Sequence, residues 1–219
     1  MTTNIENFVF DNNNTFCISL DSSVERRQRI SKRFQYFGLN VTFWSASTPD
    51  SVSNKCADFL NSGQRACAQS HMNIWKNIVE KRLQYAFVME DDACFDKHWK
   101  QKLEDFFQQK KDWDMILLNC SDIVEPSFSW QRVREQYLTG AYIISLNGAR
   151  KLVDMFGWQL SAADWMTSRL QLRGKCYSFF PWLVVQEGTE STIGSGFVED
   201  HLKVLRCLDD IEYEMDNYV

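Results

Sequence analysis

A short apolar run that ends in three acids constrains the fold of this chain more than any other feature. The run Tyr85–Met89 leads directly into Glu90, Asp91 and Asp92. Such a run is typical of a buried strand, and the alternation of side chains along a strand places Glu90 and Asp92 on one side and Asp91 on the other. The end of this strand is therefore predicted to present a cluster of carboxylates.

These three acids are a candidate cation site. Adjacent carboxylates repel one another, and packing gives no reason for them. A hard divalent cation such as Mg²⁺ or Mn²⁺ makes such a cluster favourable, because it takes carboxylate ligands and shares the rest of its coordination shell with phosphates. Acids after a strand also cap loops or helices, so a purely structural role stays open on this pattern alone.

The composition favours one globular domain with a substantial core. The chain has 219 residues, of which 44% are hydrophobic and 24% are charged, so wholesale disorder is not expected. Its formal net charge of −5 argues against a nucleic-acid partner, because nucleic-acid binders normally carry a basic surface. A phosphate-bearing substrate would need a metal ion and a few arginines to offset this acidity.

Cysteine usage and the lack of long apolar segments indicate the compartment. The 7 cysteines form no CxxC pair and, by their spacing, no zinc-like cluster with the 3 histidines, which favours a reducing compartment over a disulfide framework. Residues 1–14 are polar and lack the apolar core of a secretory signal. No segment approaches the roughly 20 apolar residues that span a bilayer. We therefore expect a cytoplasmic protein without a membrane span.

The order of predicted elements indicates an α/β fold. A strand at Thr15–Leu20 is followed by a helix that starts with a capping box of Ser22 and Glu25 and stops at Gly38, and then by a strand at Asn40–Ala46. A strand, a helix and a strand in this order are typical of parallel neighbours in one sheet.

The same alternation continues to the end of the chain. Further strands are predicted at 85–89, 114–119 and 137–145. Further helices are predicted at about 63–82, at 147–156 and at 161–172, and another helix is predicted to follow a cap at Asp96. An extended segment is predicted at 175–185 and a loop at 188–196. We expect one Rossmann-like domain with a central, mostly parallel mixed sheet flanked by helices. Its predicted boundaries are a flexible tail at 1–14, the domain at 15–198 and an acidic extension at 199–219.

Two stretches fall at the ends of predicted strands, where open α/β sheets bind ligands. Leu20 and Asp21 lead into a helix whose first turns carry arginines, Arg26 among them, and a helix start with nearby guanidinium groups suits an anion or a nucleotide. The acids at 90–92 form the second stretch. Together they predict a nucleotide-diphosphate pocket, although the arginines could also form a solvated basic face.

Several motifs follow one another along the chain: Cys17–Asp21 with Glu25-Arg26-Arg27, Gly63–His71 with Trp75, Phe87–Ala93, Gly140–Ser145 with Gly148-Ala149, and then Asp164, Pro181, Gln186 and Ser191–Ile193. In this order they resemble the motifs of the family 25 glycosyltransferases, the lipopolysaccharide and collagen β-galactosyltransferase group. They span roughly residues 16 to 194. The turn Ser22-Ser23-Val24 and Thr192 depart from the family pattern, which leaves the contacts of those positions uncertain.

The resemblance implies a glycosyltransferase A type domain that moves a hexose, galactose or glucose, from a UDP-sugar to a hydroxyl with inversion, usually with Mn²⁺ or Mg²⁺. The implied metal ligands are Glu90 and Asp92. The implied donor-binding residues are Leu20, Asp21, Arg26, Ala46, Gln64, Glu90, Asp91, Gln186 and Ser191. The implied acceptor is a glycan or hydroxylysine in a collagen-like protein. The oligomeric state stays open, a homo-oligomer included.

Asp164 is the candidate general base, because an inverting transfer needs a base opposite the leaving group. It also lies three residues after Ser161, where an acid simply favours a helix start. His71 fits a core histidine as well as a ligand-facing one. Two other functions compete with transfer: a metal-dependent phosphohydrolase or nucleotidyltransferase, and a non-catalytic scaffold that binds a nucleotide or a partner.

Overall fold

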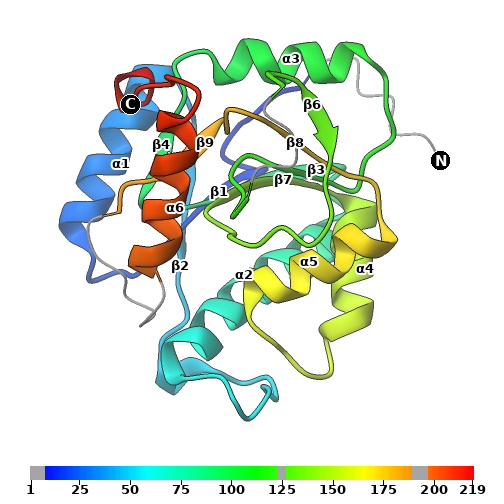
Figure 1. The fold of residues 1–219 in the computed structure, drawn as a ribbon. Coiled ribbons are helices and arrows are strands. Elements are labelled where there is room, and N and C mark those ends of the chain that lie inside the picture. The colour runs from blue at the N-terminus through cyan, green and yellow to red at the C-terminus, as the bar shows by residue number, and fades with distance from the viewer. Residues whose placement is uncertain (1–7, 123–126, 189–196) are drawn as a thin grey trace.

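A seven-stranded mixed sheet forms the centre of the protein (Figure 1). The computed structural model describes residues 8–122, 127–188 and 197–219. The strands of the central sheet, in their order across it, are β2 (Thr42–Ser45), β1 (Thr15–Ser19), β3 (Tyr85–Glu90), β7 (Ala141–Ser145), β5 (Met115–Leu117), β8 (Cys176–Phe179) and β6 (Trp130–Arg132). Strand β1 is parallel to β2 and to β3, and β5 is parallel to β8, whereas β7 is antiparallel to both of its neighbours.

Helices cover both faces of this sheet, which confirms the predicted α/β class (Figure 1). The helices α1 (Val24–Phe37) and α3 (Trp99–Gln108) lie on one face. The helices α2 (Ser62–Lys81), α4 (Leu146–Phe156) and α5 (Ala163–Arg173) lie on the other. Strand β3 shows why: Phe87 packs in the core under α1 and α3, whereas Val88 packs in the core under α2, because successive side chains point to opposite faces.

Local sequence signals set the ends of the helices that border the pocket described below. Gly38 ends α1 with a φ of 60°, a left-handed conformation that glycine adopts without strain. Asn61 caps the start of α2, where its side chain accepts a hydrogen bond from the backbone N–H of Gln64. In return, the Gln64 side-chain oxygen accepts a hydrogen bond from the backbone N–H of Asn61. Asparagine at this position satisfies N–H groups that the helix itself leaves open.

Three predicted details were wrong. Helix α1 begins after Ser23 with no side-chain cap, so Ser22 and Glu25 form no capping box. Helix α3 begins after His98, and Asp96 instead accepts a hydrogen bond from the His98 backbone N–H at 2.7 Å. Strand β7 starts at Ala141, four residues later than predicted, because residues 137–140 form a loop before the strand joins the sheet.

A small second sheet brings the end of the chain's last strand to the acids. Strands β4 (Ala93–Phe95) and β9 (Val184–Gln186) pair antiparallel, and Ala93 is opposite Gln186. The backbone N–H of Glu187 then donates to the Asp92 carbonyl at 2.8 Å. This pairing places Gln186 beside the acidic cluster, although nearly a hundred residues separate the two in sequence.

Both ends of the described chain pack onto the sheet layers. The Val9 backbone N–H donates to the Tyr85 hydroxyl at 2.8 Å. Helix α6 (Phe197–Asp209) buries Val204 and Leu208, and the backbone of Val219 pairs with Phe95. Two short 3₁₀ helices, Pro49–Ser51 and Met215–Asn217, complete the described elements. Within the described residues, no helix is both long enough and apolar enough to cross a membrane.

Candidate functional site

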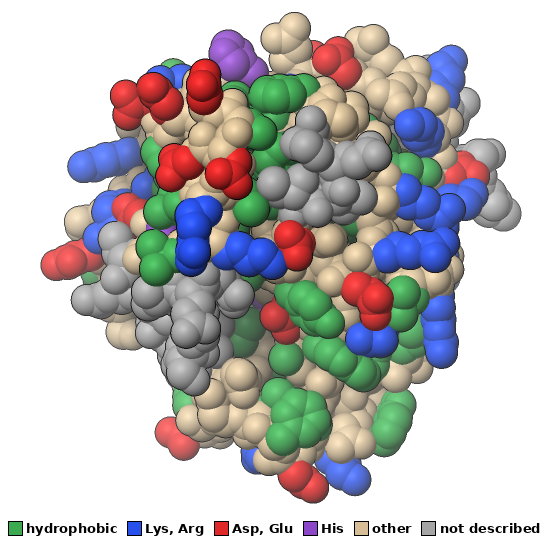
Figure 2. Space-filling view, in the orientation of Figure 1, with side chains coloured by type: hydrophobic (Ala, Val, Ile, Leu, Met, Phe, Trp, Pro, Cys, Tyr) green, Lys and Arg blue, Asp and Glu red, His purple; other side chains and the backbone are tan. Residues whose placement is uncertain are grey.

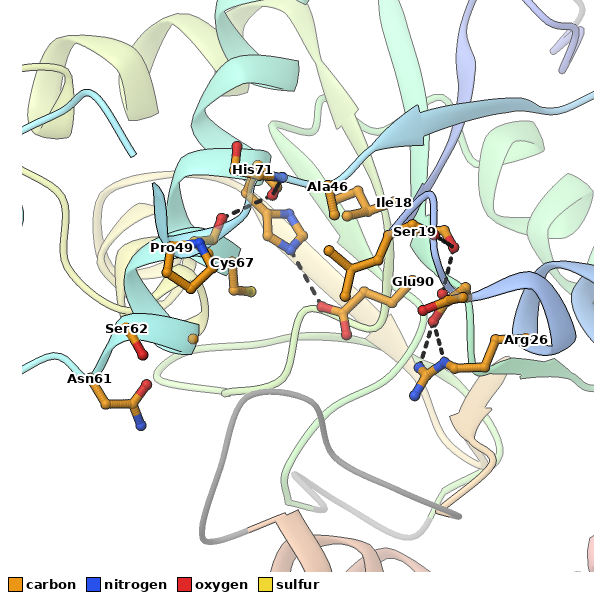
Figure 3. Close-up of a pocket in the computed structure, with 17 residues that line it drawn as sticks. Ile18, Ser19, Arg26, Ala46, Pro49, Asn61, Ser62, Cys67, His71 and Glu90 are labelled. Carbon is orange, nitrogen blue, oxygen red and sulfur yellow. Dashed lines mark hydrogen bonds and ion pairs between the residues drawn. The ribbon is translucent and has the colours of Figure 1, made fainter. Parts of the chain in front are cut away.

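A pocket of about 440 Å³ opens where β1, β2 and β3 end (Figure 3). The loops after β1 and β2, the first turns of α2 and the end of β3 form its walls. The lining residues are Ile18, Ser19, Leu20, Ser23, Arg26, Ala46, Ser47, Pro49, Asn61, Ser62, Gly63, Ala66, Cys67, Ser70, His71, Glu90 and Asp91. The three strands are mutually parallel, so the pocket lies at their carboxyl ends, where α/β sheets bind ligands.

Asp91 and Asp92 are held by one arginine of α1. Asp91 accepts hydrogen bonds from Arg26 Nε at 2.7 Å and from Ser19 Oγ at 2.6 Å. Arg26 Nη2 lies 2.5 Å from Asp91 Oδ1 and 3.2 Å from Asp92 Oδ2. Burial lowers the pKa of Arg26, but Asp92 and Asp91 raise it above its ordinary value. The guanidinium is therefore a fixed positive charge between the two acids.

Asp92 carries a buried oxygen that is available to a cation. The residue is 6% exposed, and within the described structure its Oδ1 has no hydrogen-bond partner. Burial and the nearby charge of Glu90 raise the pKa of Asp92 to about 7. Unpartnered buried polar atoms are rare in folded proteins. A carboxylate oxygen of this kind beside a second acid fits a hard divalent cation.

Glu90 points to the opposite side from Asp91, toward α2. Its Oε1 lies 3.4 Å from His71 Nε2 and accepts a hydrogen bond from Thr139 Oγ1 at 3.2 Å. Burial acts to raise the pKa of Glu90, but the interactions with His71 and Thr139 hold that pKa below its ordinary value. Glu90 is thus an ionised carboxylate at the pocket wall.

A buried hydrogen-bond network fixes His71. Its Nδ1 lies 2.9 Å from the Tyr142 hydroxyl, which accepts a hydrogen bond from Trp75 Nε1 at 2.9 Å. All three side chains are essentially inaccessible to solvent. The two predicted alternatives for His71 both apply. The ring is a buried core side chain with a hydrogen-bond partner, and its Nε2 edge lines the pocket (Figure 3).

Cys67 joins His71 and Glu90 in a close group. One ligand atom from each of the three side chains lies within 4.8 Å of the others. The spacing of cysteines and histidines in the sequence predicted no zinc-like cluster, but the fold brings one cysteine and one histidine together with a carboxylate. Cys67 and His71 are four residues apart on α2 and share its pocket face, and the third member comes from β3. Sequence spacing alone could not bring the strand residue to the helix.

The structure brings most of the predicted donor-site residues to one place. Leu20, Arg26, Ala46, Glu90 and Asp91 line the pocket. Asp92 lies behind it with Gln186, whose Nε2 donates to Asp92 Oδ2 at 3.4 Å.

Two predicted donor-site residues lie elsewhere, and the position of a third is not described. Asp21 is on the surface, paired with Arg27 and Ser45. Gln64 is occupied by the capping box of α2. Ser191 lies outside the described residues.

Asp164 lies in the first turn of α5, half-buried and close to the pocket. Its Oδ1 accepts a hydrogen bond from the Trp165 backbone N–H at 2.7 Å. Its charge contributes, after burial and Glu90, to raising the pKa of the Cys67 thiol. Asp164 is therefore within electrostatic reach of the pocket, although it does not line it.

Sequence reasoning missed several residues that build the site. Ser19 holds Asp91, Thr139 holds Glu90, and Tyr142 orients His71. Ser19 is the next-to-last residue of the strand predicted at Thr15–Leu20, and that position was a usable signal. Tyr142 looked like any apolar strand residue, and only the antiparallel pairing of β7 with β3 places it next to α2.

Hydrophobic side chains gather on the molecular surface over α5 (Figure 2). Trp165, next to Asp164, is 39% exposed, and Trp158 is 70% exposed. The Arg169 guanidinium lies 4.8 Å from the centre of the Trp165 ring. Trp182, by contrast, is 2% exposed and belongs to the core. An exposed aromatic ring beside a candidate base is suited to contact with an acceptor.

Comparison with known proteins identifies a matching family and several similar proteins. The family described as glycosyltransferase family 25 (LPS biosynthesis protein) matches residues 12–167. Procollagen galactosyltransferase 1 of Danio rerio is 36% identical over 106 residues, which cover 43% of this chain and 18% of that protein. A glycosyltransferase 25 family member of Aedes aegypti is 26% identical over 166 residues, which cover 64% of this chain and 27% of that protein.

The relatives differ in their stated activity and are longer than this chain. The protein named "Probable inactive glycosyltransferase 25 family member 3" of Rattus norvegicus is 35% identical over 105 residues, covering 43% of this chain and 18% of that protein. In these three relatives the matched region spans between 18% and 27% of the full length. The similarity thus covers one part of each longer protein.

Proposed function

The chain belongs to glycosyltransferase family 25, and we propose that it transfers a hexose, galactose or glucose, from a UDP-sugar to a hydroxyl group. The proposed acceptor is a glycan or hydroxylysine in a collagen-like protein, in keeping with the procollagen galactosyltransferases among its relatives. The observation that carries the proposal is the acidic cluster at the pocket edge, where Asp92 has a buried oxygen without a partner among the described residues, beside the ionised Glu90.

Glu90 and Asp92 are the residues that would hold a divalent cation, Mn²⁺ or Mg²⁺. When bound, such a cation supplies Lewis-acid stabilisation of the negative charge that develops on the departing UDP. The donor set fits, because it consists of carboxylates and because one of its oxygens is buried without a hydrogen-bond partner in the described structure. The contact of Gln186 with Asp92 then limits the rotation of that carboxylate.

The pocket walls suit a nucleoside diphosphate. Leu20 and Ala46 give apolar walls at the ends of β1 and β2, where the base would lie. Arg26 supplies a guanidinium at the pocket edge, and guanidinium groups bind phosphate oxygens with paired hydrogen bonds. Asp91 Oδ1 accepts a hydrogen bond from this arginine and so orients it, while Ser19 donates to the other carboxylate oxygen of Asp91.

Asp164 is the proposed base for the acceptor hydroxyl. It lies on α5, on the α2 side of the sheet. Its negative charge helps to raise the pKa of Cys67 in the pocket wall. An inverting transfer needs the base on the side of the sugar opposite the leaving group. The exposed ring of Trp165 lies next to it in sequence and would contact the acceptor.

A product assay tests this function. The protein is incubated with Mn²⁺ and each of several UDP-sugars, with glycan or hydroxylysine-containing peptide acceptors, and both UDP release and acceptor mass are measured. We expect UDP release that depends on acceptor and an acceptor mass increased by one hexose. UDP release without an acceptor product would indicate a hydrolase, and no release with any donor and acceptor would favour the scaffold alternative.

A further inference from the structure

Cys67, His71 and Glu90 offer three different metal-binding atoms to one point of the pocket wall. The candidate ligand atoms lie within 4.8 Å of one another, and His71 Nε2 is 3.4 Å from Glu90 Oε1. All three residues line the pocket, and Figure 3 shows the imidazole and the carboxylate directed at each other with the thiol beside them. Ligands of one tetrahedral zinc ion lie roughly 3.3 to 3.8 Å apart, because zinc bonds are about 2.0 to 2.3 Å long, so the three atoms are near enough to close on one ion.

The surroundings of His71 have the features of a supported metal ligand. A ligating histidine almost always engages its second ring nitrogen in a hydrogen bond, which fixes the orientation of the ring. Here Tyr142 contacts Nδ1, and Trp75 in turn donates to Tyr142. When Nδ1 carries the ring proton and donates to the Tyr142 oxygen, the lone pair of Nε2 is directed into the pocket wall toward Glu90.

The three donor atoms of Cys67, His71 and Glu90 favour a different cation from the one favoured by the carboxylates of Glu90 and Asp92. Thiolate and imidazole are ligands for Zn²⁺ and similar borderline metals, whereas Mn²⁺ and Mg²⁺ prefer oxygen. Three carboxylates, those of Glu90, Asp164 and Asp92, act on the Cys67 sulfur, so the local potential is negative and favours a cation.

We propose that Cys67, His71 and Glu90 form a second cation site in the pocket, one that takes Zn²⁺ or a similar borderline metal ion. Binding transfers the thiol proton to solvent, and the ionised thiolate and carboxylate then balance the two charges of the ion. Neutral His71 completes three protein ligands. Such a set leaves one tetrahedral position for a water molecule or a substrate oxygen.

Glu90 would be shared between the two sites. Both of its polar contacts in the described structure, with His71 Nε2 and Thr139 Oγ1, are made by Oε1, which leaves Oε2 for another partner. The zinc-type site does not depend on the proposed transferase activity, since its three ligands are defined by their own geometry. A metal-free protein sample therefore tests it directly.

Cobalt substitution provides the test. Reduced, metal-free protein is titrated with Co²⁺, and absorption is recorded for the thiolate-to-cobalt charge-transfer band and the tetrahedral ligand-field bands. We expect both bands to saturate at one ion per chain. Cys67→Ser should remove the charge-transfer band, whereas the matched control Cys207→Ser, another half-buried cysteine, should keep it. Circular dichroism confirms that each variant is folded.

Two further variants separate this site from the acidic one. Asp92→Asn should leave the charge-transfer band unchanged, while Tyr142→Phe should weaken Co²⁺ binding by about 10-fold or more, a typical loss when the outer partner of a ligating histidine is removed. A cobalt spectrum without a thiolate band, or a band unchanged in folded Cys67→Ser, would overturn the proposal. Neither result would bear on transfer by Glu90 and Asp92.

Discussion

Arg26 Nη2 lies 3.2 Å from Asp92 Oδ2, while the other carboxylate oxygen of Asp92 has no hydrogen-bond partner within the described structure. The guanidinium thus neutralises part of the acidic cluster without saturating it. Under the function proposed above, a divalent cation held by Asp92 would compete with this arginine for the same acid, and Arg26 would then be available to donor phosphates. Cation binding and donor binding would thus be linked through Arg26.

Asp92→Asn should lower transfer by about 10²-fold or more, a typical loss when one group that stabilises charge in the transition state is removed. The amide keeps the size of the side chain but not its charge, so the fold should survive. Steady-state UDP release measures the effect, with Asp105→Asn on the exposed side of α3 as the control. Near-normal transfer by Asp92→Asn would remove Asp92 from the cation site.

Arg26→Gln should destabilise the protein by about 3 kcal/mol, because removing one partner of a buried ion pair leaves uncompensated charge. The arginine side chain is 17% exposed and that of Asp91 is 8% exposed. The same variant should bind Mn²⁺ more tightly, because the competing guanidinium is gone. Urea unfolding and calorimetric titration measure the two effects. Weaker Mn²⁺ binding by the folded variant would contradict the competition.

Without a divalent cation, the contribution of Asp92 to stability should fall as the pH rises from about 4 to about 7. Burial and Glu90 raise the pKa of Asp92 from 3.8 to about 7, so in this window the folded state holds a proton that the unfolded chain has released. This contribution then decreases with pH. Asp91 adds to the shift, and Arg26 and Gln186 oppose it.

The difference between wild type and Asp92→Asn isolates this effect from other titrating groups. Urea midpoints measured across the window should converge toward acid pH and separate toward neutral pH, with the variant the more stable. A difference that does not change with pH would show that Asp92 ionises normally in the folded protein.

Tyr142→Phe should lower the free energy of unfolding by about 1 to 3 kcal/mol, the cost of leaving buried polar groups without partners. The hydroxyl serves both His71 and Trp75, and the residue is 1% exposed. Tyr36→Phe is the matched control, since Tyr36 is 63% exposed. Equal stability of the two variants would mean that water replaces the hydroxyl in the network.

Asp164→Asn should keep UDP-sugar binding but lose transfer. The side chain does not line the donor pocket, and its amide variant can still accept the hydrogen bond from the Trp165 backbone. Calorimetric titration with the donor and an acceptor-product assay separate the two effects. Loss of donor binding would reassign Asp164 to the donor site, and full transfer would show that another group is the base.

The sequence predicted the layers of the fold better than it predicted contacts between them. Continuous apolar runs located β1 and β3, and an apolar helical face located α2. Gly38 marked the end of α1 because a local backbone requirement is visible in a local signal. The antiparallel insertion of β7 between β3 and β5 could not be predicted, because strand order depends on which buried surfaces meet and not on local propensity.

In the candidate site, too, some residues could be predicted from local sequence and others could not. The acids at 90–92 and Arg26 were identifiable as types of residue at strand and helix ends, where ligands collect. Their partners were not, since Ser19, Thr139 and Tyr142 act through single hydrogen bonds across elements distant in sequence. The role of Gln64 also depended on a neighbour, because Asn61 engages it in a capping box.

A crystal structure with UDP and Mn²⁺ tests the central claim most directly. The predicted result is Mn²⁺ bound by Glu90 and Asp92, with the diphosphate on the ion and on Arg26 and with the base between Leu20 and Ala46. The contradictory result is a nucleotide bound elsewhere, with Arg26 still paired to both Asp91 and Asp92 and no ion among the acids.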